Sequence, residues 1–364
     1  MFRNAGMVTI ITMLLAACQG AKHSFTLVPD EQSFQQNSLE VVQRKIDILW
    51  VVDNSGSMTP FQQSLTENFQ AFLQDFLQKD YDFHLAVTTT DAYLADPQFR
   101  NQPTLSKFRD GGTLPARGFP LIDNQTPDPL ATFTANALQG SSGSGDERAF
   151  SSFKASLSNP ANSQFLRKDS FLAIIILSNE DDFSNPTRPE RTTANAGTYP
   201  DQNYSDPGLE SIDSYVSYLD QLTLSQNENR NYTVSAVTVL NQECVDSYPG
   251  QGLTIGRRVI ELAQKTGGVL GSICSPNYSQ VLNNIQKRII ELSTEFPLKR
   301  IPKLGSIRVH INGDPLIEDA ENGWTYNSVK NSILFHGKGV PPKAATVSIY
   351  FEPAESLKPH IGQL

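Results

Sequence analysis

The chain has 364 residues, of which 38% are hydrophobic and 18% are charged, and its formal net charge is −9. This balance supports a folded core and excludes a chain that is disordered throughout. The length is enough for two domains of ordinary size. Because an acidic surface repels phosphate backbones, we expect no nucleic-acid partner.

An apolar segment near the N-terminus ends in a cysteine. The run Met7–Ala17 is too short to span a bilayer and leads directly into Cys18. Its end, Leu15-Ala16-Ala17-Cys18, resembles a bacterial lipobox, so we expect residues 1–17 to be a signal peptide and Cys18 to carry a lipid. The alternative is an ordinary signal peptide with a chance cysteine. Since Gln19 and not Asp follows, the resemblance implies the outer membrane, with the protein facing the cell surface or the periplasm.

A polar, Gln- and Ser-rich segment without sustained periodicity follows the cysteine, so residues 18–42 are expected to form a flexible tether. Strand patterns then alternate with helix patterns over residues 43–294. This alternation predicts an α/β domain with a doubly wound, mostly parallel sheet. The expected strands are 45–52, 83–90, 171–177, 232–240 and 269–272, with a short edge strand within 113–122, and the expected helices are about 61–76, 130–138, 146–157, 210–222, 255–265 and 278–292.

The pattern changes near the C-terminus to short strands in which apolar and polar residues alternate. Val309 and Ile311 alternate in this way and precede Asn312-Gly313, a strong hairpin turn. Residues 295–364 are therefore expected to form a small antiparallel β domain. We expect it to pack on the first domain, because so few strands bury little core alone.

The motif Asp53-Asn54-Ser55-Gly56-Ser57 lies between the first apolar strand and an amphipathic helix. It resembles the first loop of the metal-ion-dependent adhesion site (MIDAS) of von Willebrand factor A (VWA) domains, and residues 43–294 resemble bacterial VWA lipoproteins. The resemblance implies a VWA- or Rossmann-like fold in which Asp53, Ser55 and Ser57 hold Mg²⁺ or Mn²⁺, with Ca²⁺ as a further candidate. Hydroxyl and carboxylate oxygens are ligands that magnesium accepts. The alternative is a simple helix-capping turn.

The second loop of such a site normally supplies a Thr. The corresponding segment here is Gly140-Ser-Ser-Gly-Ser-Gly145, which precedes a predicted helix. Ser142 is the expected replacement, since its hydroxyl ligates as that of Thr does, and Ser144 is the alternative. A flexible connector without a ligand is the other interpretation.

The third loop normally supplies an Asp directly after a buried strand. Asn179 stands at that position here and is followed by three acids. Asp181 is expected to take over the role, or Asn179 binds through its amide oxygen. Glu180, Asp182 and Asp91, which follows another strand, are possible substitute or second-layer ligands. A solvated acidic turn is the alternative.

Two further cysteines, Cys244 and Cys274, each follow a predicted strand. An exported chain meets an oxidising compartment, so we expect a disulfide between them. Two unpaired buried thiols are the alternative.

Enzyme signatures are absent from the sequence. The five histidines have no paired-ligand spacing, and the Gly-rich run at 140–145 matches neither a dinucleotide-binding motif nor a P-loop. We therefore expect a non-enzymatic, lipid-anchored envelope protein or adhesin, which engages an acidic group of a protein or glycan ligand through the metal ion. The polar insertions 92–128 and 183–208 would shape its specificity. The alternatives are a periplasm-facing assembly or scaffolding lipoprotein that docks a protein, and a metal-dependent hydrolase.

Overall fold

The computed structural model describes residues 34–40, 45–78, 81–192, 195, 206–225, 230–342 and 345–354. The expected signal peptide, Cys18 and most of the expected tether lie outside these ranges. Within them, no helix is both long enough and apolar enough to cross a membrane.

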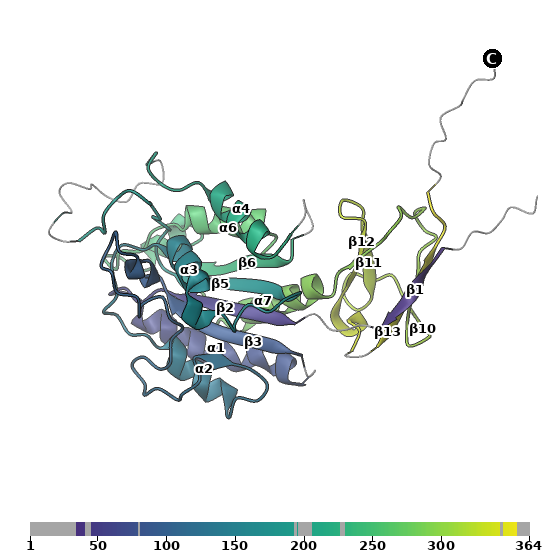
Figure 1. Cartoon of the computed structure of the whole chain (residues 1–364), viewed down its shortest axis with the longest axis horizontal. Coiled ribbons are helices and arrows are strands. Elements are labelled where there is room, and N and C mark those ends of the chain that lie inside the picture. Colours follow the sequence, from purple (N-terminus) through teal and green to yellow (C-terminus); the bar gives the residue numbers. More distant parts are fainter. Residues whose placement is uncertain are drawn as a thin grey trace, which may run out of the picture.

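A six-stranded sheet forms the centre of the larger part of the molecule (Figure 1). All neighbouring strands are parallel except β4, which runs antiparallel to β3 at one edge. Every residue of β2 and β5 is buried, which explains why both strands are mostly apolar in the sequence; the exception within β2 is the buried Asp47, which pairs with Arg167. In spatial order the strands are β4 (Leu121–Ile122), β3 (Phe83–Thr89), β2 (Ile46–Val52), β5 (Phe171–Ser178), β6 (Tyr232–Thr238) and β7 (Leu270–Ser272).

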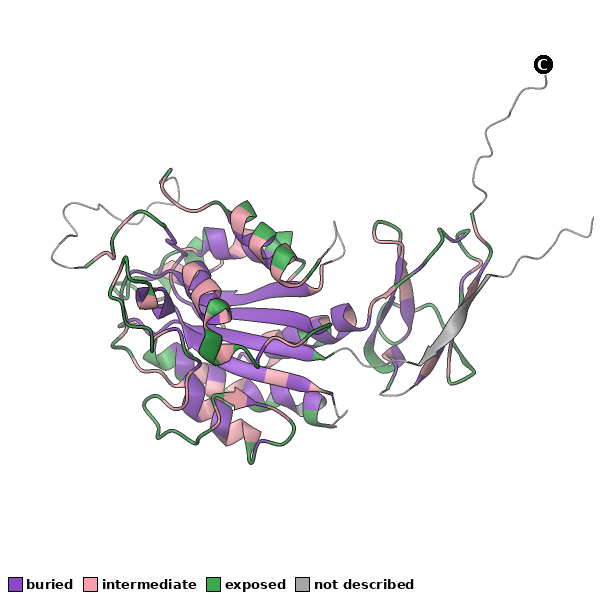
Figure 2. Ribbon diagram, in the orientation of Figure 1, coloured by how far each residue is buried: buried purple, intermediate pink, exposed green. Residues whose placement is uncertain are grey.

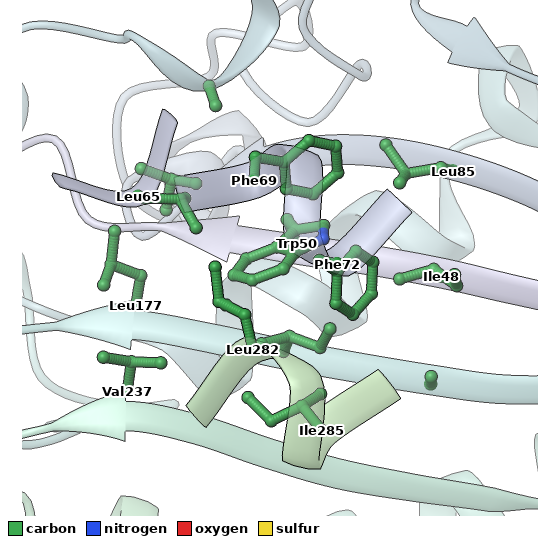
Figure 3. Close-up of a cluster of buried hydrophobic side chains, with 14 of the residues drawn as sticks. Ile48, Trp50, Leu65, Phe69, Phe72, Leu85, Leu177, Val237, Leu282 and Ile285 are labelled. Carbon is green, nitrogen blue, oxygen red and sulfur yellow. The ribbon is translucent and has the colours of Figure 1, made fainter. Parts of the chain in front are cut away.

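Helices cover both faces of this sheet, and the burial of its strands is plain in Figure 2. On one face, Trp50 of β2 packs edge-on against Phe69 and Phe72, with ring centroids 6.0 and 5.5 Å apart (Figure 3). Leu49 and Val51 of the same strand enter the core of the other face. The first face is covered by α1 (Thr59–Gln78), α2 (Pro129–Ala137) and α7 (Ser279–Ser293), and the second by α3 (Ala149–Ser158), α4 (Ile212–Leu222) and α6 (Arg257–Lys265).

The other strands form two small antiparallel sheets with a shared hydrophobic core that includes Trp324, Phe335 and Ile349. Asn312 and Gly313 both have positive φ, 53° and 92°, and form the predicted turn between β9 and β10. One sheet has the order β1 (Phe34–Glu40), β13 (Thr346–Phe351), β9 (Arg308–Ile311), β10 (Asp314–Leu316), and the other β11 (Trp324–Asn327), β12 (Ser332–Phe335), β8 (Phe296–Pro297). The short elements are α5 (Gln242–Asp246), η1 (Ala92–Ala95), η2 (Pro160–Asn162) and η3 (Gly337–Gly339).

The architecture corrects the expected fold class. A doubly wound, mostly parallel VWA- or Rossmann-like sheet with one small C-terminal antiparallel domain was the prediction, and it is wrong. The structure has a six-stranded mixed sheet and two separate antiparallel sheets. One of these takes β1 from before the main sheet and pairs it with β13 near the other end of the chain. The sequence of β1, Phe-Gln-Gln-Asn-Ser-Leu-Glu, is too polar to have predicted a strand within the expected tether.

The expected disulfide is confirmed. Cys244 and Cys274 are bonded, with their Cα atoms 5.6 Å apart. Cys244 lies in α5, which follows β6, and Cys274 follows β7. The bond therefore joins α5 to the loop after β7, beyond the carboxyl ends of the neighbouring strands β6 and β7.

The two small sheets lie at one end of the molecule in Figure 1, and the six-stranded sheet extends away from them. Strand β2 begins at that end, and α7 returns to it before β8. Asp53 and Asn179 follow the carboxyl ends of β2 and β5. The loops that carry the predicted site therefore lie at the opposite end of the six-stranded sheet.

Candidate functional site

The first loop holds its aspartate in a fixed orientation. Asp53 Oδ1 accepts a hydrogen bond from the backbone N–H of Ser55 at 2.8 Å, and Oδ2 accepts one from Ser178 Oγ at 2.8 Å. Gln62 Nε2 donates to the Asp53 carbonyl at 2.7 Å. The side chain of Asp53 is fully buried. The loop itself, the end of β5 and the start of α1 thus position the carboxylate together.

Two neutral oxygens of these loops, Ser55 Oγ and Asn179 Oδ1, are buried and make no hydrogen bond of standard geometry among the described residues, although the Ser55 side chain lies close enough to Asp53 to lower its pKa. The amide of Asn179 is oriented by its other end, since Nδ2 donates to Ser57 Oγ at 2.7 Å. Orphaned buried oxygens are uncommon because each forfeits its bond to water. Both are therefore available as ligands.

Glu147 is a site residue that the sequence did not reveal. Its side chain is 1% exposed, and neither carboxylate oxygen makes a hydrogen bond of standard geometry among the described residues, although Thr90 and Asp53 lie close enough to act on its pKa. Burial, and then the charges of Asp53 and Glu180, raise the pKa of Glu147 well above its usual value of 4.5. Burial also raises the pKa of Asp53. Two acids from different loops therefore share one buried space.

The location of Glu147 explains why it was missed. A helix was predicted from residue 146, but α3 begins at Ala149, so Glu147 lies in the loop before the helix. The resemblance predicts a hydroxyl ligand in the second loop, within residues 140–145. The available signal was an acid at the end of that Gly- and Ser-rich run, immediately before an apolar helix face.

Asp181, predicted as a third-loop ligand, points toward a helix. Its Oδ1 accepts hydrogen bonds from the backbone N–H groups of Arg258 at 2.9 Å and Val259 at 3.4 Å, in the first turn of α6. Burial raises the pKa of Asp181 to about 7. The carboxylate thus supplies acceptors that a helix N-terminus lacks. Metal binding by Asp181 stays a prediction. Its Oδ1 already accepts hydrogen bonds from the backbone of α6.

Asp182 is engaged in the same way at another helix. Its Oδ1 accepts hydrogen bonds from the Phe150 N–H at 2.9 Å and from Ser184 Oγ at 2.8 Å, and its Oδ2 lies 3.3 Å from Arg258 Nη2. Glu180 is the acid of this run that faces the site. It is partly exposed, and burial followed by the charge of Asp53 raises its pKa to about 8.

The serines of the second loop are in different environments. The N–H of Gly143 donates to the Asn54 carbonyl at 2.8 Å, which brings the second loop against the first. Ser142 is exposed at the tip, and no hydrogen bond of its side chain occurs within the described part of the chain. Ser144 Oγ donates to Glu190 Oε1 at 2.9 Å and accepts from the Asp146 N–H at 3.2 Å. Ser144 therefore holds an insertion, whereas Ser142 remains free to ligate.

Asp91 supports the first loop from the side. Its Oδ2 accepts a hydrogen bond from Asn54 Nδ2 at 3.0 Å, and its Oδ1 accepts from Arg109 Nη2 at 3.1 Å and from Thr89 Oγ1. The carboxylate is thus shared among an amide, a guanidinium and a hydroxyl. A role for Asp91 as a second-layer or substitute ligand of a metal ion stays a prediction.

The described parts of both polar insertions are packed around Arg148, which is fully buried. The Arg148 guanidinium binds Asp146 Oδ2 through Nη2 at 2.7 Å and Nε at 3.1 Å. It also donates to the carbonyls of Asn185 at 2.8 Å and Pro189 at 3.0 Å, in the second insertion. From the first insertion, the ring of Tyr93 lies 4.8 Å from the guanidinium carbon. The loops beside the site are therefore held by Arg148, which directly follows Glu147 in the sequence.

Within the described residues, no three His, Cys, Asp or Glu side chains converge as metal ligands. A cation beside Asp53 and Glu147 would therefore also need neutral oxygens. Ser55 Oγ and Asn179 Oδ1 are buried beside them without partners, so the residues present fit an oxygen-coordinated divalent ion.

No known family and no curated protein matches the sequence. Solved structures similar to this chain include bacterial pilus adhesins. SpaC from Lactobacillus rhamnosus GG has a TM-score of 0.41 and 12% identity, over 86% of this chain and 39% of its own. RrgA from Streptococcus pneumoniae has a TM-score of 0.32 and 10% identity, over 85% and 56%. The human COPII-coat protein Sec24c has a TM-score of 0.37 and 11% identity, over 86% of this chain and 40% of its own.

The chain thus spans about two fifths of the length of SpaC. At TM-scores below 0.5, these likenesses fix neither the fold nor the function of this chain.

Proposed function

We propose that this protein is an adhesin-like binding protein of the bacterial cell envelope, which engages a protein or glycan partner through a divalent cation at the first loop. The observation that carries the proposal is the buried carboxylate of Glu147, which makes no hydrogen bond of standard geometry among the described residues and shares its space with Asp53. The lipobox-like end of the N-terminal segment supports the envelope location, with Cys18 as the lipid anchor. The proposal does not rest on the structural neighbours.

Two ionised carboxylates in one buried space repel each other and lose their hydration. A divalent cation would neutralise both and supply a partner for each orphaned oxygen. Asp53, Glu147, Ser55 and Asn179 would hold it, with Ser57 at the open side. A site made only of oxygens suits Mg²⁺, Mn²⁺ or Ca²⁺ rather than softer metals. Such a site is similar in kind to the MIDAS that the first loop resembles.

The open side of the site supports a role in binding. Ser57 and Glu180 are partly exposed, and Gly56 is exposed. A partner group can therefore approach the ion without displacing the buried carboxylates.

The proposal is tested by thermal unfolding of the mature chain in EDTA, Mg²⁺ and Mn²⁺. A cation at 100 times its Kd stabilises the folded state by about 2.7 kcal/mol, so the Tm rises in Mg²⁺ or Mn²⁺. Asp53→Ala removes the rise. Asp314→Ala, an exposed acid in the small sheets, keeps it and serves as the matched control. A wild-type Tm that is the same in EDTA and in both cations contradicts the proposal.

A further inference from the structure

One exposed loop of the small sheets is locally basic in an acidic chain. The loop covers residues 299–304, between β8 and β9. The chain as a whole has a net charge of −9. Residues 299–313, in contrast, contain no acidic side chain and include the basic residues Lys299, Arg300, Lys303 and Arg308. The loop can therefore attract an anionic partner that the rest of the surface repels.

The same loop also exposes two large apolar side chains. Ile301 is 65% exposed and Leu304 is 76% exposed. Exposed apolar residues are ordinary when they are scattered singly, but among the described residues no other two large ones lie so close together in the sequence. Lys303 lies between them, and its ammonium group pairs with the exposed Glu352 at 2.8 Å. A surface pair of this kind is weak, so the phosphate group of a partner can replace the carboxylate.

Backbone hydrogen bonds hold the loop against the end of β13. The N–H of Ala354 donates to the Ile301 carbonyl at 2.8 Å, and the N–H of Lys303 donates to the Glu352 carbonyl at 2.7 Å. Pro302, between these two positions, is buried. The loop therefore presents its apolar and basic side chains from a fixed backbone.

The N-terminal part of the chain enters the small sheets at the same place. Phe34 of β1 pairs with Phe351 of β13, the residue before Glu352. Because β1 and the loop both pair with the end of β13, they lie within about two strand spacings, roughly 10 Å. Residues 19–33 connect Phe34 to Cys18 and span at most about 55 Å. A lipid at Cys18 would thus bring this end of the small sheets close to a bilayer.

We infer that residues 299–304 form a membrane-contact loop, which binds the surface of a bilayer that contains anionic phospholipid. Its basic side chains bind headgroup phosphates. Ile301 and Leu304 enter the boundary between headgroups and acyl chains, while the lysine ammonium groups stay in water. The inference goes beyond the proposed cation site and shares with the proposed function only the lipid anchor at Cys18.

The contact fixes the direction in which the candidate site points. The small sheets lie at one end of the molecule in Figure 1, and the loops after β2 and β5 lie at the opposite end of the six-stranded sheet. A lipid alone holds the chain at the membrane without orienting it. With the loop on the bilayer, Asp53 and Asn179 face away from the membrane, toward a partner.

Vesicle sedimentation tests the inference on the mature chain with Cys18→Ser, so that no lipid anchor contributes. The vesicles contain phosphatidylethanolamine and phosphatidylglycerol, and vesicles of phosphatidylcholine are the neutral comparison. The ionic strength is low, because salt screens the attraction. EDTA is present throughout, so the result does not depend on the cation site.

Two variants of this parent chain separate the apolar from the basic contribution. One carries Ile301→Ser and Leu304→Ser, and the other carries Lys299→Gln and Lys303→Gln. All four positions are exposed, and the Tm of each variant should match that of the parent. The matched control carries Lys107→Gln and Leu114→Ser, which are exposed positions in the polar insertion 92–128.

The parent and the control are expected to bind anionic vesicles with partition coefficients within about twofold of each other, and neutral vesicles about tenfold more weakly. Each loop variant should lose about tenfold or more on anionic vesicles. A parent without preference for anionic vesicles, or a lysine variant that binds as the parent does, overturns the inference. So does an apolar variant that binds as tightly as the parent, which would assign the loop to an acidic partner in solution.

Leu304→Trp reports directly on insertion. Trp50 and Trp324, the two native tryptophans, are both buried. The emission of the added tryptophan should shift to shorter wavelength with anionic vesicles, and an unchanged emission contradicts insertion. A wild-type Tm that does not respond to Mg²⁺ or Mn²⁺ contradicts the proposed function and leaves this inference standing.

Discussion

Asn179 donates a hydrogen bond from Nδ2 to Ser57 Oγ over 2.7 Å, which joins the end of β5 to the first loop. Its Oδ1 is buried and has no hydrogen-bond partner among the described residues. The amide therefore offers a neutral oxygen at the position where the resemblance places an Asp. The predictions that follow concern Asn179, the other acids of the candidate site, Arg148 and the disulfide.

Asn179→Asp places a third charge beside Asp53 and Glu147 and removes the donor to Ser57. In EDTA we expect the free energy of unfolding to fall by about 1–3 kcal/mol, because the added charge is buried and repelled. In Mg²⁺ or Mn²⁺ the variant should gain more stability than the wild type. Asn179→Ala, which removes the oxygen without adding charge, should gain less. Equal stability of Asn179→Asp and wild type in EDTA would count against a buried acidic pair.

Glu147→Gln tests whether Glu147 is a metal ligand or has only a packing role. The amide keeps the shape of the side chain and removes the repulsion with Asp53. In EDTA at mildly alkaline pH we expect the free energy of unfolding to exceed that of the wild type by about 1–3 kcal/mol, and addition of Mn²⁺ should raise the Tm by less than it does in the wild type. Differential scanning calorimetry in both conditions measures the two changes. A loss of stability in EDTA with an unchanged rise in Mn²⁺ would assign Glu147 a purely structural role.

The stability of the metal-free protein should fall as the pH rises from about 4 to about 8. Burial raises the pKa of Asp181 to about 7 from its usual 3.8, and burial with the charge of Asp53 raises that of Glu180 to about 8 from 4.5. The folded state therefore holds protons that the unfolded chain has released, so unfolding releases protons and the free energy of unfolding decreases with pH.

Urea unfolding in EDTA at several pH values measures this slope. Asp181→Asn should make the slope shallower, because an amide at this position still accepts from the N-terminus of α6 without titrating. Mg²⁺ should remove only the part due to Glu180 and Glu147, since Asp181 faces α6. A stability that rises with pH over this range would contradict the buried, protonated acids.

Arg148→Met tests whether the buried guanidinium holds the insertions in place. The substitution removes the ion pair between Arg148 and the buried Asp146, and it removes donors to the carbonyls of Asn185 and Pro189. We expect a loss of about 3–5 kcal/mol in the free energy of unfolding, measured by urea unfolding. The control is Lys154→Met, because the Lys154 ammonium group is partly exposed beside Glu210. It should cost under about 1 kcal/mol, as for a surface ion pair. Similar losses in both variants would contradict the anchoring role.

Removing the disulfide should destabilise the part of the chain that holds the six-stranded sheet without abolishing its fold. A closed segment with a sequence separation of 30 corresponds to about 3–4 kcal/mol in the chain-entropy treatment. The double variant Cys244→Ser and Cys274→Ser should show this loss in urea unfolding. Reduction of the wild-type protein by dithiothreitol should match it. An unchanged free energy of unfolding after reduction would show that the bond adds little to stability.

The sequence predicts the strands of the main sheet well because burial on both faces leaves a strong local signal. β2 and β5 are mostly apolar runs whose every residue is buried. The pairing of the shorter strands depends on segments that lie far apart in the sequence, so the local pattern does not predict it. β1 is polar and pairs with β13 from the other end of the chain, and β4 has only two residues. The edge strand was expected within 113–122, but its antiparallel direction and the division into two small sheets escaped prediction.

The candidate site was predictable only in part, for a related reason. The Asp53 motif is local, and the turn of chain between β2 and α1 can be read directly. The roles of the other acids depend on which group each of them contacts in the folded chain. Asp181 meets α6 and Asp182 meets α3, whereas Glu147 meets Asp53. Three similar acids thus acquire different roles that no spacing along the chain distinguishes.

The most direct test is equilibrium Mn²⁺ binding to the wild type, Glu147→Gln and Asp181→Asn, measured by electron paramagnetic resonance of the free ion. Asp53 and Glu147 together predict one Mn²⁺ per wild-type chain, retained in Asp181→Asn and weakened by about tenfold or more in Glu147→Gln. A wild-type chain that binds no Mn²⁺, or a Glu147→Gln variant that binds it as tightly as the wild type, would contradict the account.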